Sequence, residues 1–128
     1  MSMRAPLGRV RGLGSAKQGS AHWWSQRLGA LALIPLSLWF AASVAGMAGA
    51  DYYTMRAWVG SPLVAGLLLL LIVATFHHGY LGLQVIIEDY IHHEGLKWAS
   101  LLIALAASIV LGLAGVLSVL MILFKGQA

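Results

Sequence analysis

Three long apolar runs constrain the fold of this chain more than any other feature of its sequence. They cover residues 28–50, 62–87 and 98–124, and few or no ionisable side chains interrupt them. A bilayer core of about 30 Å is spanned by about 20 helical residues, so each run is long enough to cross a membrane. Because that core holds no water to satisfy backbone amides, we expect each run to be an α-helix. The chain length and the lack of alternating polarity exclude a closed barrel.

The composition agrees with a membrane protein. Of the 128 residues, 60% are hydrophobic and only 9% are charged, and the mean hydropathy is +0.85. Soluble domains rarely show such values. The sequence contains no cysteine, which excludes disulfides and thiolate-held clusters and leaves histidine as the strongest metal-ligand type. Three helices leave little room for an enclosed active site, so we expect a subunit rather than a self-contained enzyme.

We divide the chain into two regions. Residues 1–26 form a basic arm without the apolar core of a secretion signal, so we expect the arm to be retained. Residues 27–128 form an all-α membrane domain with three transmembrane helices at about 28–50, 62–90 and 97–124.

The distribution of basic residues predicts the orientation in the membrane. Of the eight Lys and Arg residues, five lie in residues 4–27 and one is Lys97, whereas only Arg56 and Lys125 flank the helices on the other side. Because basic residues accumulate in the cytoplasm, the N-terminus is expected there. The net charge of +4 therefore indicates this topology and a lipid bilayer partner. Nucleic acid is not an expected partner, since the basic residues are scattered.

The second apolar run carries the most informative segment, HHGYLGLQVIIEDY at residues 77–90. Charged side chains at membrane depth cost about 2.5 to 3.5 kcal/mol on insertion scales, and a neutral imidazole costs less but still needs a partner. Ligation of a cofactor is one explanation for the histidines. A hydrogen bond between helices is the alternative.

Helical neighbours distinguish the two histidines of this segment. His78 has Ala74 and Gly82 four residues away on either side, whereas the corresponding neighbours of His77 are larger. A flat porphyrin bound through one imidazole needs cleared space beside its ligand, so the small residues favour His78. We interpret His77 as a residue that packs or supports the ligand.

An acidic and a phenolic side chain end the same segment. Eleven residues separate His78 from Asp89, which places both within about 20° of one helix face and about 16 Å apart along the axis. Tyr90 follows directly, and a phenol can hydrogen-bond a carbonyl while a carboxylate handles protons, as quinone reduction requires. His92 and His93 are expected to be solvated at the interface, with a metal site as the alternative.

At these residues the chain resembles the small hydrophobic membrane anchor of bacterial succinate:quinone oxidoreductase, also called succinate dehydrogenase or respiratory complex II. The pattern is a histidine, a glycine four residues later, and Asp-Tyr at eleven and twelve before an apolar residue. Here these are His78, Gly82, Asp89, Tyr90 and Ile91. A histidine, aromatic residues and an arginine precede the first helix in that family, and here these are His22, Trp23, Trp24 and Arg27.

The resemblance implies roles for individual residues. His78 would be an axial ligand of heme b, and therefore of its iron. Tyr90 would hydrogen-bond ubiquinone with Asp89 beside it. Arg27 would lie near a heme propionate or the quinone pocket. His22 receives no role, because Trp23 stands where enteric relatives have aspartate.

The resemblance also implies partners and a location. They are a cytochrome b556-type anchor subunit that gives the second axial ligand, an iron-sulfur subunit, and a flavoprotein subunit, with FAD and the iron-sulfur clusters held only by the latter two. The complex would pass electrons from succinate to ubiquinone across subunits in the bacterial inner membrane. Two alternatives stay open: a heme-free structural anchor of a fumarate reductase-like or other membrane complex, and a metal path that uses both histidine pairs.

Overall fold

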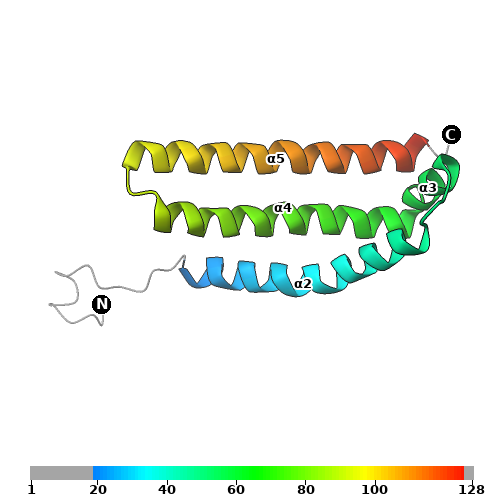
Figure 1. Cartoon of the computed structure of the whole chain (residues 1–128), viewed down its shortest axis with the longest axis horizontal. Helices are drawn as coiled ribbons and strands as arrows, with labels where there is room; N and C mark the ends of the chain where they lie inside the picture. The colour runs from blue at the N-terminus through cyan, green and yellow to red at the C-terminus, as the bar shows by residue number, and fades with distance from the viewer. Residues whose placement is uncertain (1–18, 126–128) are drawn as a thin grey trace, which may run out of the picture.

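The computed structural model describes residues 19–125, and this part of the chain consists of helices joined by short connections (Figure 1). The helices are α2 (Gly19–Gly46), α3 (Tyr52–Val59), α4 (Pro62–Tyr90) and α5 (Glu94–Lys125). By length and composition α2, α4 and α5 can each cross a membrane. The predicted all-α membrane fold with three spans is confirmed. Most of the basic arm lies outside the described residues.

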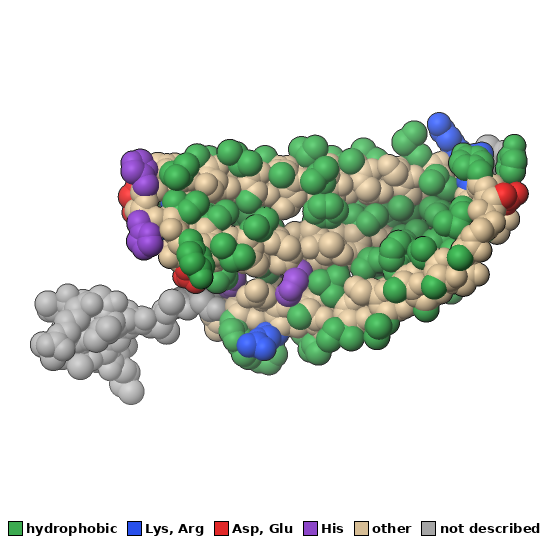
Figure 2. Space-filling model, viewed as in Figure 1, with side chains coloured by type: hydrophobic (Ala, Val, Ile, Leu, Met, Phe, Trp, Pro, Cys, Tyr) green, Lys and Arg blue, Asp and Glu red, His purple; other side chains and the backbone are tan. Residues whose placement is uncertain are grey.

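The three long helices form a single layer with α4 in the middle. Helix α4 packs against α5 on one side and against α2 on the other, whereas the backbones of α2 and α5 stay apart within residues 19–125 (Figure 1). Consecutive spans run in opposite directions. Few side chains can be buried in such a layer, and they are Ala65, Leu68, Leu81, Ile87 and Val119. Large apolar side chains cover the outside, as expected for helices that face lipid (Figure 2).

Helix α2 begins before the first apolar run. Its first residue is Gly19, so Trp23, Trp24 and Arg27, which precede residue 28, belong to the helix. Pro35 lies inside α2, and the helix continues through it and curves along its length (Figure 1). Proline is tolerated in membrane helices because neighbouring groups satisfy the backbone carbonyl that it leaves free.

The connection between the first two spans contains a short helix that the apolar pattern does not predict. Asp51 caps the N-terminus of α3, because its Oδ1 accepts a hydrogen bond of 2.9 Å from the backbone N–H of Thr54. Gly60 ends the helix by donating its backbone N–H to the Arg56 carbonyl oxygen at 2.9 Å. The ring of Trp58 stacks on Trp39 of α2 with the centroids 5.9 Å apart. This contact ties α3 to the layer.

Glycines bring α4 and α5 close together. A β-carbon at Gly112 would lie 3.4 Å from the ring of Phe76, and one at Gly115 would lie 3.3 Å from two atoms of Ile72. Small residues allow membrane helices to approach closely, which replaces the hydrophobic effect as the source of association. The helix that carries the histidine segment, α4, is therefore closely packed against α5.

Candidate functional site

His78 lies half-buried on the side of α4 that faces α2. A β-carbon at Gly29 of α2 would lie 3.6 Å from Nδ1 of His78 and 3.8 Å from its Cβ. The helices therefore approach each other over this imidazole, and glycine leaves room for the ring. Nδ1 is buried without a hydrogen-bond partner among the described residues, whereas Nε2 is not enclosed in this way. Nε2 is therefore the imidazole nitrogen that a ligand could reach.

A hollow of about 250 Å³ lies between His78 and the N-terminal part of α2. It is lined by Trp23, Gln26, Arg27, Ala30 and His78. The guanidinium carbon of Arg27 lies 5.1 Å from the centroid of the Trp23 ring, a cation–π distance. The structure thus brings Arg27 and His78, 51 residues apart in the sequence, to one site. A fixed cation beside an imidazole suits a ligand that carries both a metal and an acidic group.

The space beside His78 is open on the face that the sequence analysis selected. No atom from elsewhere in the described chain lies within 4 Å of a β-carbon placed on Gly82, and the same holds for Gly79. Ligand pockets usually measure about 300 to 1,000 Å³, so the hollow at His78 is small for a complete cofactor site. A cofactor as large as a porphyrin would therefore need a second wall from another molecule.

Asp89 and Tyr90 lie outside this hollow. They are the last two residues of α4, and both are exposed, Tyr90 to 79%. Neither side chain forms a hydrogen bond with another described residue, whereas the neighbouring Glu88 accepts one of 2.9 Å from Nε2 of Gln84. The helix end therefore presents a free carboxylate and a free phenol to whatever covers it.

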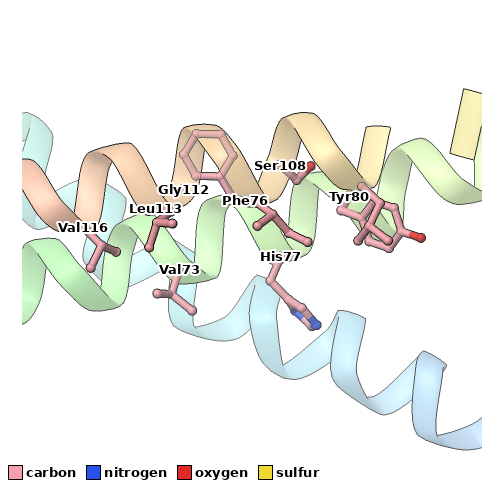
Figure 3. A pocket seen from close by; sticks show the side chains of 10 residues that line it. Val73, Phe76, His77, Tyr80, Ser108, Gly112, Leu113 and Val116 are labelled. Atoms are coloured by element: carbon pink, nitrogen blue, oxygen red, sulfur yellow. The ribbon is translucent and has the colours of Figure 1, made fainter. Parts of the chain in front are cut away.

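His77 occupies a different environment from His78. It is exposed and lines a hollow of about 360 Å³ along the α4–α5 seam, where Tyr80 and Ser108 are the other polar side chains. Its imidazole points away from α5 (Figure 3). Because the remaining lining is apolar and holds no cation, this hollow is a weaker candidate for a charged cofactor than the hollow at His78.

The turn between α4 and α5 gives one histidine a structural role. Nδ1 of His93 accepts a hydrogen bond of 3.3 Å from the backbone N–H of Leu96, so His93 caps the N-terminus of α5. His92 is exposed. Among residues 19–125 no group of three or more His, Asp or Glu side chains is arranged to hold a metal ion.

His22 of α2, to which the sequence analysis gives no role, has a buried imidazole nitrogen but does not line the hollow at His78. Its Nε2 is buried without a hydrogen-bond partner among the described residues. The spacing of His22 in the sequence could have indicated its position. His22 precedes Gln26 by four residues and Gly29 by seven, which places all three on one face of α2. That face meets α4 at Gly29, so His22 lies on the helix side that leads to the hollow.

The fold and the site together define a class of protein. The chain has three helices long and apolar enough to cross a membrane, and the central one presents an imidazole beside an arginine in a small hollow. Comparison with known proteins gives the family. The model of the succinate dehydrogenase/fumarate reductase transmembrane subunit matches residues 1–115.

Individual relatives agree with the family model. The chain is 34% identical over 94 residues to the succinate dehydrogenase hydrophobic membrane anchor subunit of Rickettsia bellii, covering 73% of this chain and 75% of the relative. The subunit of the same name from Rickettsia conorii is 32% identical over 95 residues, with the same coverage. That from Paracoccus denitrificans is 32% identical over 85 residues, or 66% of each chain. The chain belongs to the family of succinate dehydrogenase hydrophobic membrane anchor subunits, which confirms the resemblance.

Proposed function

We propose that this chain, with a second anchor subunit, holds one heme b and completes a ubiquinone-reduction site in a bacterial inner-membrane succinate:ubiquinone oxidoreductase. The observation that supports it is the position of His78, whose imidazole stands in a hollow beside Arg27 with open space over Gly82. The relatives named above are bacterial membrane anchors of succinate dehydrogenase, in agreement with that location.

The donor set at His78 suits a heme. The imidazole would be one axial ligand through Nε2, because α2 encloses Nδ1. The guanidinium of Arg27 would pair with a propionate or lie at the edge of the quinone pocket. Ala30 and Gly82 leave space for a flat macrocycle. When bound, the heme supplies one-electron transfer, and a cytochrome b556-type partner supplies the other axial ligand and the second wall.

The end of α4 suits a quinone contact. The phenol of Tyr90 would donate a hydrogen bond to a quinone carbonyl oxygen, and the carboxylate of Asp89 would hold or pass a proton to it. Both groups are exposed here and have no hydrogen bond to a described residue, so they are available to a pocket closed by partner subunits. The iron-sulfur subunit would deliver electrons that the flavoprotein subunit takes from succinate.

One preparation tests both halves of the proposal. We expect the intact complex purified with His78→Leu to lose or alter its b-type absorption in reduced-minus-oxidised spectra, because an axial ligand is removed. We expect Tyr90→Phe to keep the spectrum and to raise the KM for ubiquinone by about tenfold, the effect of one lost hydrogen bond of about 1.4 kcal/mol. His77→Leu, one position away on the exposed face, is the matched control and should leave the spectrum unchanged.

The alternative of a heme-free structural anchor makes the opposite prediction. If the wild-type complex shows no b-type absorption, or if His78→Leu assembles with an unchanged spectrum, the heme proposal is wrong. Mass identification of the co-purifying subunits tests family and assembly in the same sample. Absence of flavoprotein and iron-sulfur subunits would instead favour the metal-path alternative.

A further inference from the structure

Two basic side chains converge at the end of the molecule that carries α3. Arg56 of α3 and Lys125, the last residue of α5, line the same two adjoining hollows, of about 440 and 410 Å³. They are 69 residues apart in the sequence and are the two basic residues outside the group that the sequence analysis assigns to the cytoplasmic side. The fold therefore gathers the scarce positive charge of this side in one place.

The charges of this pair are not balanced by neighbouring acids in residues 19–125. No carboxylate of the described chain lies within ion-pair distance of Arg56 or Lys125. Asp51 is the one acidic residue of this connection, and its Oδ1 already accepts the N–H of Thr54 that begins α3. Two cations that share a hollow repel each other, and an anion between them offsets this repulsion. The arrangement therefore suits an anionic ligand.

The position of the hollows indicates the depth of that ligand. Tyr53 borders one hollow and Tyr52 the other, and their rings contact each other edge to face with centroids 5.7 Å apart. Exposed tyrosines at the ends of membrane spans lie at the level of lipid headgroups. Met121 and Ile122 continue the second hollow along α5 toward the membrane interior, which gives it an apolar lower part.

We propose that Arg56 and Lys125 bind the phosphate of an anionic phospholipid, with the tyrosine hydroxyls at the headgroup and an acyl chain along Met121 and Ile122. Guanidinium and ammonium groups are the usual protein ligands of phosphate. A polar upper part and an apolar lower part match a lipid rather than a soluble anion. The simpler reading is that Lys125 only complements the carbonyl end of α5, and the experiment separates the two.

The test uses the complete complex with its native partner subunits, delipidated in detergent and titrated with phosphatidylglycerol while bound lipid is counted by native mass spectrometry. Each basic residue near a membrane surface strengthens binding of anionic lipid about fivefold. We expect Arg56→Gln or Lys125→Gln to weaken the tightest phosphatidylglycerol site about fivefold and the double variant about thirtyfold. Lys97→Gln, a cation at the other end of the molecule, is the matched control and should change nothing.

Two further arms identify the chemistry. Phosphatidylcholine should not fill the site, and inorganic phosphate in excess should not displace phosphatidylglycerol from it. Displacement by phosphate would show an anion site without lipid selectivity and overturn the proposal. Equal lipid binding by the wild type and the double variant, with the subunits still assembled, would overturn it as well and leave helix-end compensation as the role of the pair.

Discussion

Glycine at a few positions decides how closely the spans approach each other. At Gly29 the missing side chain leaves room for the imidazole of His78, and at Gly115 it leaves room for Ile72. The two contacts differ in tightness, because a β-carbon would lie 3.6 Å from the nearest atom at Gly29 but 3.3 Å at Gly115. A methyl group is therefore tolerated at the first position and crowded at the second.

We expect Gly115→Ala to destabilise the α4–α5 pair by about 1 kcal/mol. Alanine gains helix propensity of about 1 kcal/mol, but overpacking costs about 1 to 3 kcal/mol, and β-branched Ile72 has little rotamer freedom to yield. The midpoint of unfolding in mixed micelles measures the difference. Gly66→Ala is the control, because nothing lies within 4 Å of a β-carbon there. An equal or higher midpoint for Gly115→Ala would show that α5 shifts without cost.

Two imidazole nitrogens stand out at the same scale. Nε2 of His22 and Nδ1 of His78 are both buried without partners among the described residues. An unpaired buried polar group costs about 1 to 3 kcal/mol. Such a cost is removed when a water, a cofactor group or a partner side chain supplies the missing hydrogen bond. These two nitrogens are therefore positions where binding of such a group would stabilise the protein.

Among the elements, the short helix α3 depends most on local contacts such as its cap. It has eight residues, none of them buried, so packing contributes little to it. Isolated helices of this length are marginal in water. The hydrogen bonds of Asp51 and the Trp39–Trp58 stack supply the order that its length cannot.

The cap makes α3 sensitive to pH in one direction. Hydrogen bonds from the side chain and then the backbone of Thr54 hold the pKa of Asp51 below its ordinary value of 3.8. The ionised cap is therefore fully effective above pH 3.8, and its contribution is lost as the pH falls through the lowered pKa. We expect the amides of α3 to exchange with deuterium on the order of fivefold faster in Asp51→Ala at neutral pH.

Asp51→Asn separates charge from capping, because asparagine caps a helix at any pH. The exchange rate of the wild type relative to Asp51→Asn should stay constant down to pH 3.8 and rise below it. A ratio that begins to rise well above that pH would show that the carboxylate is not stabilised by Thr54.

At the scale of the whole molecule, the sequence predicts some features well for physical reasons. Apolar runs must become helices in a bilayer, so the three spans could be predicted without a template. His78 was distinguished from His77 by the size of its neighbours on one helix. The α3 helix could not be found this way, since its order comes from a cap and from Trp58 meeting Trp39 across the chain.

The site was predictable only in part for a similar reason. The residues on α4 share one helix, so their relative positions follow from helical geometry. The hollow between Arg27 and His78 depends on the axial position of α2 relative to α4. The periodicity within one helix does not determine that register. The burial of His22 depends on this register too, so it could not be predicted from the sequence.

The absence of cysteine makes the predicted orientation directly measurable. We expect a cysteine at Ala48, in the turn after α2, to react with a membrane-impermeant maleimide added outside intact cells. A cysteine at His92, at the opposite end of the layer, should react only after the membrane is permeabilised. The reverse pattern would place the N-terminus outside and move the proposed lipid site to the cytoplasmic leaflet.

The single layer of helices determines how this chain can recognise its partners. Until subunits join, acyl chains surround both broad faces of the layer, and they are as apolar as leucine. Replacing these acyl chains by a neighbouring helix therefore yields little hydrophobic free energy, even when the contact area is large. Selectivity must come from the few places that acyl chains fill badly: the gap over Gly82 and the two unpaired imidazole nitrogens. A helix that does not fit at these places binds no more tightly than lipid does. The chain then stays in the bilayer as a folded but unassembled subunit.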